Sequence, residues 1–268
     1  MSSNPADHHR TTLMDAAYSD VYGAMYRRHW WWRAREHQVL ALIRRHVEKG
    51  DGPGKVLDVG CGDGLIWDSL TGFAHIEGIE PDSRLIHPAS PRRDRIEIAD
   101  FLRGRPRPAD HDLLLMLDVL EHIEDEHAAL LRAKALLAPR GILLLTVPAL
   151  PALWSEFDEM SGHFRRYTRR SLRRALTAAG LEIIDLRYSY FWTVPPLFVR
   201  RLLFRAAAGE QSLFLRPPPA PINSALHMVS RLDHALSRRI PLPVGSSLVA
   251  VAGTRPVPRG RQGAVRSR

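Results

Sequence analysis

One short run of residues constrains the fold of this 268-residue chain more than any other feature. It reads Val56-Leu-Asp-Val-Gly-Cys-Gly-Asp-Gly64, an apolar strand that enters a turn with glycine at every second position. Glycine lets the backbone turn tightly and lets a ligand approach without a Cβ clash. We expect an apolar helix to come after the turn and to direct its N-terminal N–H groups toward a bound ligand.

A carboxylate lies about twenty residues beyond this turn, a spacing typical of nucleoside-binding sheets. It is Glu80, which ends the strand Ile76-Glu-Gly-Ile-Glu80 and is placed to accept hydrogen bonds from both hydroxyls of a ribose. The turn lacks the G-x-G-x-x-G spacing, and Asp58 before it would repel a pyrophosphate but attract an ammonium group. The alternative interpretation is a purely structural turn with Glu80 as a solvated strand end.

Strand and helix patterns alternate along most of the chain, which predicts an α/β fold with a doubly wound, mostly parallel sheet. Thr168 is a plausible N-cap for a helix that Gly180 ends. The expected strands are 55–59, 75–80, 95–99, 112–117, 141–147, 181–188 and 246–253, and the expected helices are 124–137 and 168–179.

Four segments in this order resemble the successive motifs of class I S-adenosylmethionine-dependent methyltransferases. They are Leu57-Asp-Val-Gly-Cys-Gly-Asp-Gly64, Gly78-Ile-Glu-Pro-Asp82, Asp112-Leu-Leu-Leu-Met-Leu-Asp-Val-Leu-Glu-His-Ile123 and Pro139-Arg-Gly-Ile-Leu-Leu-Leu-Thr-Val-Pro148. The resemblance covers about residues 55–186. It implies a Rossmann-like sheet of seven strands with the last one antiparallel, and S-adenosylmethionine as the cofactor.

The resemblance also implies where each part of the cofactor binds. The glycine turn would hold the methionine part, the end of the second strand the ribose, the end of the third strand the adenine, and the end of the fourth strand the sulfonium. In that order the residues are Asp58, Gly60, Cys61, Gly62 and Gly64; Glu80 and Pro81; Asp100 and Phe101; Leu117 and Asp118. Asp100 has a second interpretation, as the cap of a turn or helix.

Methyl transfer from a sulfonium is an in-line displacement, so positioning supplies most of the rate and a general base is optional. His122, after the fourth strand, and His163, after the fifth, are the candidate bases. His163 lies in a D-x4-H-x-R-R-Y segment that resembles a bacterial subgroup of the family. Asp158 is the third candidate catalytic residue, and Arg165, Arg166 and Tyr167 are candidates for binding the acceptor. His122 could instead pack or cap a helix, and the segment could be a charged loop.

The formal net charge of +9 favours an anionic partner, although only three of the 38 basic residues are lysines. We expect a small-molecule or lipid-like acceptor and, most simply, O-methylation. A nucleic-acid methyltransferase is an alternative, because tryptophans 30–32 interleave with arginines, as is a non-catalytic protein that retains the fold. Residues 188–205 are apolar with bordering arginines and could contact a membrane surface.

The remaining expectations concern organisation and location. The single cysteine and the scattered histidines suggest no metal site, and no apolar run is long enough to cross a membrane, so a cytoplasmic protein is expected. The expected divisions are an N-terminal helical cap (1–50), the cofactor-binding core (51–190), an insertion or lid (191–245), the last core strand (246–254) and a disordered basic tail (255–268).

Overall fold

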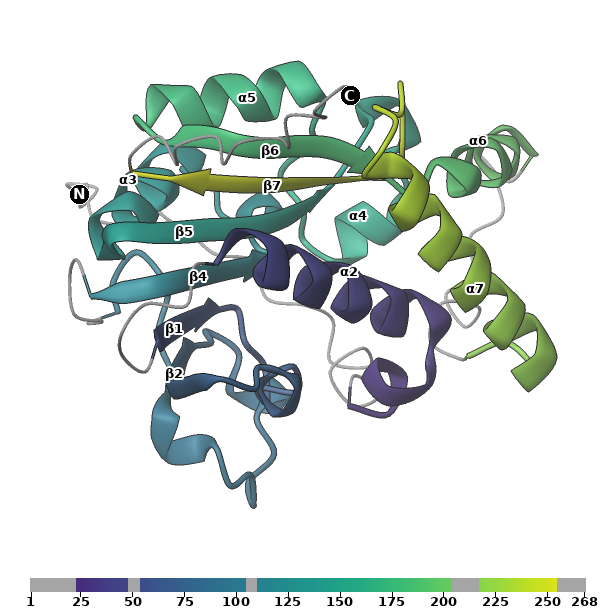
Figure 1. Cartoon of the computed structure of the whole chain (residues 1–268). Coiled ribbons are helices and arrows are strands. Elements are labelled where there is room, and N and C mark those ends of the chain that lie inside the picture. Colours follow the sequence, from purple (N-terminus) through teal and green to yellow (C-terminus); the bar gives the residue numbers. More distant parts are fainter. Residues whose placement is uncertain (1–22, 48–53, 105–109, 204–216, 255–268) are drawn as a thin grey trace, which may run out of the picture.

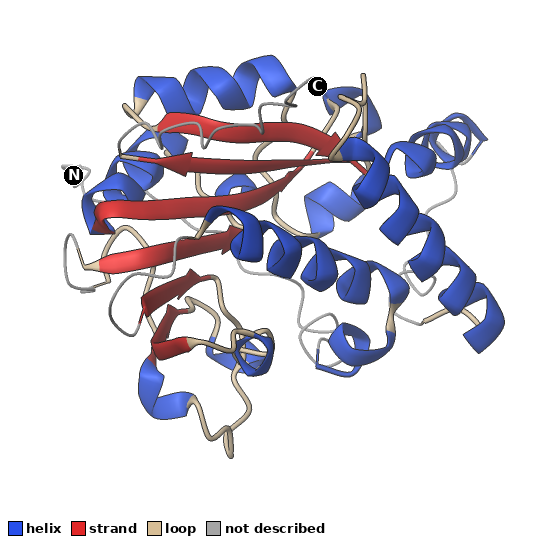
Figure 2. Ribbon diagram, viewed as in Figure 1, coloured by secondary structure: helices blue, strands red, loops and turns tan. Residues whose placement is uncertain are grey.

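The structure, a computed structural model, describes residues 23–47, 54–104, 110–203 and 217–254. Its centre is a seven-stranded sheet with the order β3-β2-β1-β4-β5-β7-β6 (Figures 1 and 2). The strands are β1 (Gly54–Val59), β2 (Phe73–Ile79), β3 (Ile96–Glu97), β4 (His111–Leu117), β5 (Leu137–Pro148), β6 (Glu182–Ser189) and β7 (Ser247–Gly253). Strand β7 runs antiparallel to both of its neighbours, and the other pairs are parallel. The doubly wound fold expected from the sequence is confirmed.

Helices cover both faces of the sheet. They are α2 (Trp30–His46), α3 (Glu126–Leu136), α4 (Glu156–Met160), α5 (Arg169–Ala178), α6 (Val194–Leu203) and α7 (Ala220–Ser237). Helices α3 and α5 pack on one face, and α2 lies across the other, in front of the sheet in Figure 1. Successive side chains of β4 point to opposite faces, so Leu114 packs toward α3 while Leu113 packs toward α2. The central strands are therefore continuous apolar runs.

The helix expected directly after the glycine turn is absent from the described residues, and that expectation was wrong. Gly60, Gly62 and Gly64 have φ values of 67°, 52° and 64°, in the left-handed region that cannot continue a right-handed helix. The chain then forms only a three-residue 3-10 helix (Trp67–Ser69) before β2 begins. Strand β3 is also shorter than expected.

The helix predicted after residue 168 is present with the expected boundaries. Thr168 caps α5: its side chain accepts a hydrogen bond from the Ser171 N–H, and the Ser171 hydroxyl pairs in return with the Thr168 N–H at 3.0 Å. Gly180, with φ of 70°, lies just beyond the end of the helix. These residues mark where α5 begins and ends, shortly before β6 starts at Glu182.

Two helices, α6 and α7, lie between β6 and β7, within the segment expected to be an insertion or lid. Whether it acts as a lid stays a prediction. The predicted basic tail and the first 22 residues of the predicted helical cap lie outside the described residues. Among the residues described, no helix is both long and apolar enough to cross a membrane.

Candidate active site

The glycine turn and the end of β2 are tied together by one buried carboxylate, Glu80. Its Oε2 accepts the Gly62 N–H at 2.8 Å, and its Oε1 accepts the Asp82 N–H at 2.8 Å. Burial raises the pKa of Glu80 to about 7. A carboxylate has about four acceptor positions, so two remain for hydroxyl donors. Glu80 thus fixes the shape of the turn and keeps capacity for a ribose.

Two positions, Gly60 in the turn and Gly78 on β2, lie so close to neighbouring side chains that a Cβ would not fit. A Cβ on Gly60 would lie 2.5 Å from Val119 Cγ2, and a Cβ on Gly78 would lie 2.4 Å from the Cys61 sulfur. The buried Cys61 thiol therefore packs against β2 and donates to the Gly62 carbonyl at 3.3 Å. Because the Cys61 side chain is buried, the prediction that this residue helps hold a cofactor concerns its backbone.

Asp58, at the end of β1, is buried and already has one partner. Its Oδ2 accepts the indole N–H of Trp67 at 2.8 Å, and burial raises its pKa to about 7. The sequence analysis missed Trp67, although an indole donor close after a buried acid is a recognisable signal. The other carboxylate oxygen of Asp58 is the one left to meet a cation.

Asp118, after β4, adopts a left-handed conformation with φ of 57°. Its Oδ1 accepts from the Thr146 hydroxyl at 3.1 Å, and its Oδ2 forms an ion pair with Arg35 of α2. The Arg35 guanidinium also donates to the Leu117 carbonyl at 3.4 Å and lies 4.4 Å from the centre of the Trp32 ring. Helix α2 therefore closes the site at the end of β4. The sequence carried no sign of this contact, because the partners are more than 80 residues apart.

Asp100 and Phe101, the residues predicted to contact the adenine, both have contacts within the protein. Asp100 accepts the Leu102 N–H at 2.8 Å, which is the turn-capping role considered as its alternative. Phe101 is buried in the core cluster with Ile79. The Phe101 side chain therefore packs in the core, and its assignment to cofactor contact stays a prediction. Pro81 stays partly exposed beside Glu80.

The D-x4-H-x-R-R-Y segment folds around Asp158, whose carboxylate is fully buried. Its Oδ1 is 2.8 Å from His163 Nδ1 and accepts from Arg166 Nε at 2.7 Å, while Oδ2 accepts from the Ser155 N–H at 2.9 Å. Burial alone would raise the pKa of Asp158, but the hydrogen bonds from His163 and Arg166 outweigh burial and lower it to about 2. Asp158 is inaccessible to an acceptor, so its predicted catalytic role becomes that of a positioning residue.

The two candidate bases lie side by side at the carboxyl edge of the sheet. The rings of His122 and His163 are 4.6 Å apart and nearly perpendicular. Burial, and then the neighbouring His163, lower the pKa of His122 to about 3, so its imidazole is neutral at physiological pH. Asp158 holds His163 through Nδ1, which fixes the proton there and leaves Nε2 as the acceptor. With its pKa this low, His122 is a poor proton acceptor, so His163 is the better placed of the two candidate bases.

Glu121 was missed by the sequence analysis and is the most unusual residue of the site. It is fully buried, and neither carboxylate oxygen has a hydrogen-bond partner among the described residues. Burial, and then the charge of Asp118, raise its pKa well above the ordinary value. Glu121, His122 and His163 each offer one ligand atom, and these atoms lie within 4.8 Å of one another. A carboxylate and two imidazoles suit a divalent cation. The sequence did not indicate this group, because its three residues come from two loops.

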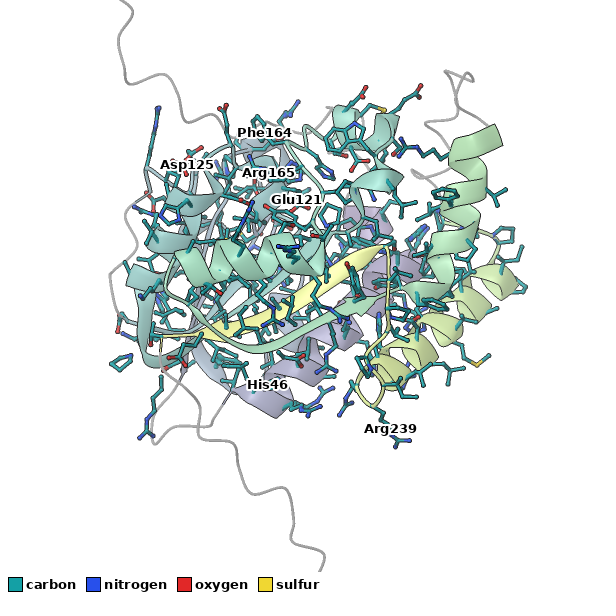
Figure 3. The ribbon with its side chains drawn as sticks, turned by 90° about the horizontal axis from the view of Figure 1, so that it is seen from above. His46, Glu121, Asp125, Phe164, Arg165 and Arg239 are labelled. Atoms are coloured by element: carbon teal, nitrogen blue, oxygen red, sulfur yellow. The ribbon has the colours of Figure 1, made fainter. Side chains whose placement is uncertain are left out.

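The remaining residues of the segment are occupied by contacts within the protein. Arg165 donates to the carbonyls of Ile123 and Glu124 at 3.1 and 2.6 Å, and Figure 3 shows its loop beside Glu121. Arg166 holds Asp158. Tyr167 is a buried core residue whose hydroxyl donates to Glu126 at 2.8 Å. The prediction that Tyr167 binds the acceptor is corrected, because the core covers its ring.

Comparison with known proteins agrees with this geometry. A family profile described as a methyltransferase domain matches residues 31–186, more than half of the chain. A ubiquinone biosynthesis O-methyltransferase from Rhodopseudomonas palustris (strain TIE-1) is 33% identical over 109 residues, which is 38% of this chain and 42% of that relative. The chain therefore matches less than half the length of this curated relative.

Solved structures show the same fold at low sequence identity. A chain of the complex between the Haloferax volcanii Trm112 methyltransferase activator and the putative methyltransferase has a TM-score of 0.58 at 17% identity, covering 91% of this chain and 99% of that one. The [4+2]-cyclase SpnF has a TM-score of 0.57 at 18% identity, covering 89% and 93%.

The seven-stranded sheet, the glycine turn and the acidic strand ends define a class I methyltransferase fold. The chain belongs to the methyltransferase domain family, as a class I S-adenosylmethionine-dependent member.

Proposed function

We propose that this protein transfers the methyl group of S-adenosylmethionine to an oxygen atom of a small or lipid-like acceptor. The observation that carries the proposal is the imidazole of His163, which Asp158 holds through Nδ1 with Nε2 free, beside the strand ends expected to hold the cofactor. The names of the curated relatives, ubiquinone biosynthesis O-methyltransferases, support oxygen as the attacked atom.

The cofactor would lie over the carboxyl ends of β1, β2 and β4, where open α/β sheets bind their ligands. Glu80 has two acceptor positions for the ribose hydroxyls. The free oxygen of Asp58 and the backbone of the glycine turn would hold the methionine part. Asp118, with Arg35 as its fixed counter-ion, would lie near the sulfonium. S-adenosylmethionine supplies an electrophilic methyl group when bound.

The protein's own residues would supply position and a proton acceptor. An acceptor hydroxyl within hydrogen-bond distance of His163 Nε2 would pass its proton to that nitrogen as its oxygen bonded to the methyl carbon and the carbon–sulfur bond broke, releasing S-adenosylhomocysteine. The resulting imidazolium is stabilised by the Asp158 carboxylate, which stays ionised because its pKa is lowered to about 2. Holding the oxygen and the methyl carbon in line accounts for most of the acceleration.

The nucleic-acid alternative has lost part of its basis. Trp32 is buried, Trp31 packs on Trp32 and Tyr190, and Trp30 packs on Trp192, with ring centres 4.8 to 6.4 Å apart. These ring contacts pack α2 against the residues just after β6, so part of the aromatic surface is unavailable for stacked bases. The structural likeness to a [4+2]-cyclase shows that this fold also serves other chemistry, so activity must be tested directly.

A peripheral membrane contact would suit a lipid-like acceptor in the cytoplasm. Within residues 188–205, the side chains of Tyr188 and Tyr190 are buried, while Phe191, Phe198 and Val199 are exposed. Exposed aromatic and aliphatic side chains on a helix favour a headgroup layer. We propose that this exposed side, and not the tyrosines, would meet a membrane.

The test is the substitution His163→Gln. Glutamine keeps an N–H that can reach Asp158 but lacks the basic nitrogen. We expect turnover to fall by about 10²- to 10⁴-fold while cofactor affinity changes little. The matched control is His127→Gln, because His127 is an exposed histidine on α3. Acceptors are screened with methyl-labelled cofactor against quinols, phenolic polyketides and lipid extracts. Equal losses of affinity and turnover would show that His163 is structural.

A further inference from the structure

A second recess lies away from the candidate active site, between α2 and α7, which run side by side (Figure 1). It has about 60 Å³ of space. A single water needs roughly 10–15 Å³ on this measure, so the space admits a group the size of a tetrahedral oxyanion. Its lining is His37, Gln38, Ala41, Leu42, Arg187, Arg231, His234, Ala235, Ser237 and Arg238.

Every titratable side chain of this lining is basic. Arg187 is paired with Asp185, whose Oδ1 accepts from Arg187 Nε at 2.8 Å. Arg231 and Arg238 form no ion pair with any residue that the structure describes. Burial, and then the charges of Arg231 and nearby arginines, lower the pKa of His37. Among the described residues, the charges of Arg231 and Arg238 in the recess therefore have no acidic partner.

One side chain in the recess is buried without a partner. His234 is 4% exposed, and neither ring nitrogen makes a hydrogen bond within the described part of the chain. Its ring packs edge-on against Tyr190 at 4.7 Å. The neighbouring Asp233 does not pair with His234: its oxygens accept the Tyr190 and Phe191 N–H groups at 2.8 and 2.9 Å. A buried imidazole left unpaired is costly, and a ligand in the recess would pair it.

We propose that this recess binds a phosphate-type oxyanion, held by the guanidinium groups of Arg231 and Arg238 and by the imidazole of His234. Guanidinium groups present paired N–H donors that match phosphate oxygens, and an imidazole can donate one more hydrogen bond. Arg231 and His234 lie on α7, and Arg238 comes directly after this helix. A fourth basic residue of the lining, His37, lies on the facing helix α2. The site does not depend on the proposed methyl transfer.

The exposed side of α7 indicates two possible sources of the phosphate group. Next to the recess, the helix and the residues just after it present a stripe of exposed apolar side chains, Met228, Leu232, Leu236 and Ile240. Such a stripe beside a basic recess suits a phospholipid headgroup. A free phosphate ester has the same recognition chemistry without the membrane, so the experiment must separate the two.

The test is thermal unfolding of the full chain with inorganic phosphate at constant ionic strength. At ten times its Kd, phosphate should raise the Tm by about 3 to 6 °C. The double substitution Arg231→Ala, Arg238→Ala should weaken binding by about tenfold or more. Arg239→Ala is the matched control, because Arg239 projects outward from the next position on the chain (Figure 3) and does not line the recess. No stabilisation of the natural protein, or equal stabilisation of all three proteins, overturns the proposal.

The source is distinguished by sedimentation with vesicles of phosphatidylcholine alone or mixed with phosphatidylglycerol. Binding to the mixed vesicles that disappears in the double variant and in excess phosphate identifies a lipid headgroup. A phosphate-dependent rise in Tm without vesicle binding identifies a free phosphate group. Vesicle binding that survives in the double variant, together with an unchanged Tm in phosphate, contradicts the site.

Discussion

The substitution Glu80→Gln tests the centre of the proposed cofactor site without requiring the acceptor. Glutamine has the size of glutamate, but one of its two terminal groups is an NH₂ that cannot accept the N–H of Gly62 or Asp82. One buried N–H is then unpaired, at a cost of about 1–3 kcal/mol in unfolding free energy. For a domain of this size the Tm should fall by about 2 to 12 °C.

The effect on cofactor affinity should be larger than a structural change alone would give. The ribose hydroxyls lose a charged acceptor, worth about 1.5–3 kcal/mol, so Kd should rise by about 10- to 150-fold. Because the pKa of Glu80 is raised to about 7, its carboxylate is ionised at pH 8 and largely protonated at pH 6. The difference in affinity between the natural protein and Glu80→Gln should therefore be greatest at pH 8 and shrink toward pH 6.

Calorimetric titration with S-adenosylhomocysteine measures this affinity. Glu77→Gln is the control, since Glu77 lies on the same strand but its Oε1 pairs with His111 at 2.8 Å, away from the glycine turn. We expect that variant to bind normally. Unchanged affinity of Glu80→Gln at pH 8 would refute the ribose assignment. Equal weakening of cofactor binding by both substitutions would also contradict it, because the loss would then reflect a general change in the strand.

Three further predictions concern stability. Asp158→Asn leaves the largely buried Arg166 without its counter-charge, so chemical denaturation should show a loss of about 3 kcal/mol, and a loss below about 1 kcal/mol would contradict the pair's role. Tyr167→Phe removes the hydrogen bond to Glu126, so the unfolding free energy should fall by about 1 kcal/mol while turnover stays unchanged. A large drop in turnover would indicate that Tyr167 does contact the acceptor. Burial lowers the pKa of four histidines as far as about 3 or 4, so the unfolded chain binds protons at these residues that the native state does not, and the Tm should fall as pH drops below 6.5 toward 3; a Tm constant over this range would contradict their burial. They are His29, His46, His122 and His234.

The sheet could be predicted from the sequence because its signals are local. Each strand is a short apolar run, whereas the antiparallel last strand was expected only from the resemblance to methyltransferase motifs. After Gly64, where a helix was expected, the chain forms only turns and a three-residue 3-10 helix, and the three glycines before it have left-handed φ values. Glycine spacing indicated the turn correctly but carried no information about the conformation of the residues between Gly64 and β2.

The site was predictable only where its residues stand at strand ends. Glu80 and Asp58 lie at the ends of strands, so their position at the carboxyl edge could be inferred. Arg35 reaches Asp118 from a distant helix, and Glu121 becomes notable only through its burial without a partner. Tyr167 shares the same segment as His163, yet the fold buries the first in the core and holds the second beside His122. Sequence proximity cannot distinguish these roles, because they depend on packing between distant elements.

The most direct test of the proposed cofactor site is a calorimetric titration of the full chain with S-adenosylmethionine, S-adenosylhomocysteine and NAD. The glycine turn with Asp58 and Glu80 should bind both sulfur nucleosides with a Kd in the micromolar range and should not bind NAD, whose pyrophosphate Asp58 would repel. Binding of NAD alone, or of none of the three, would contradict the assignment of this site to S-adenosylmethionine.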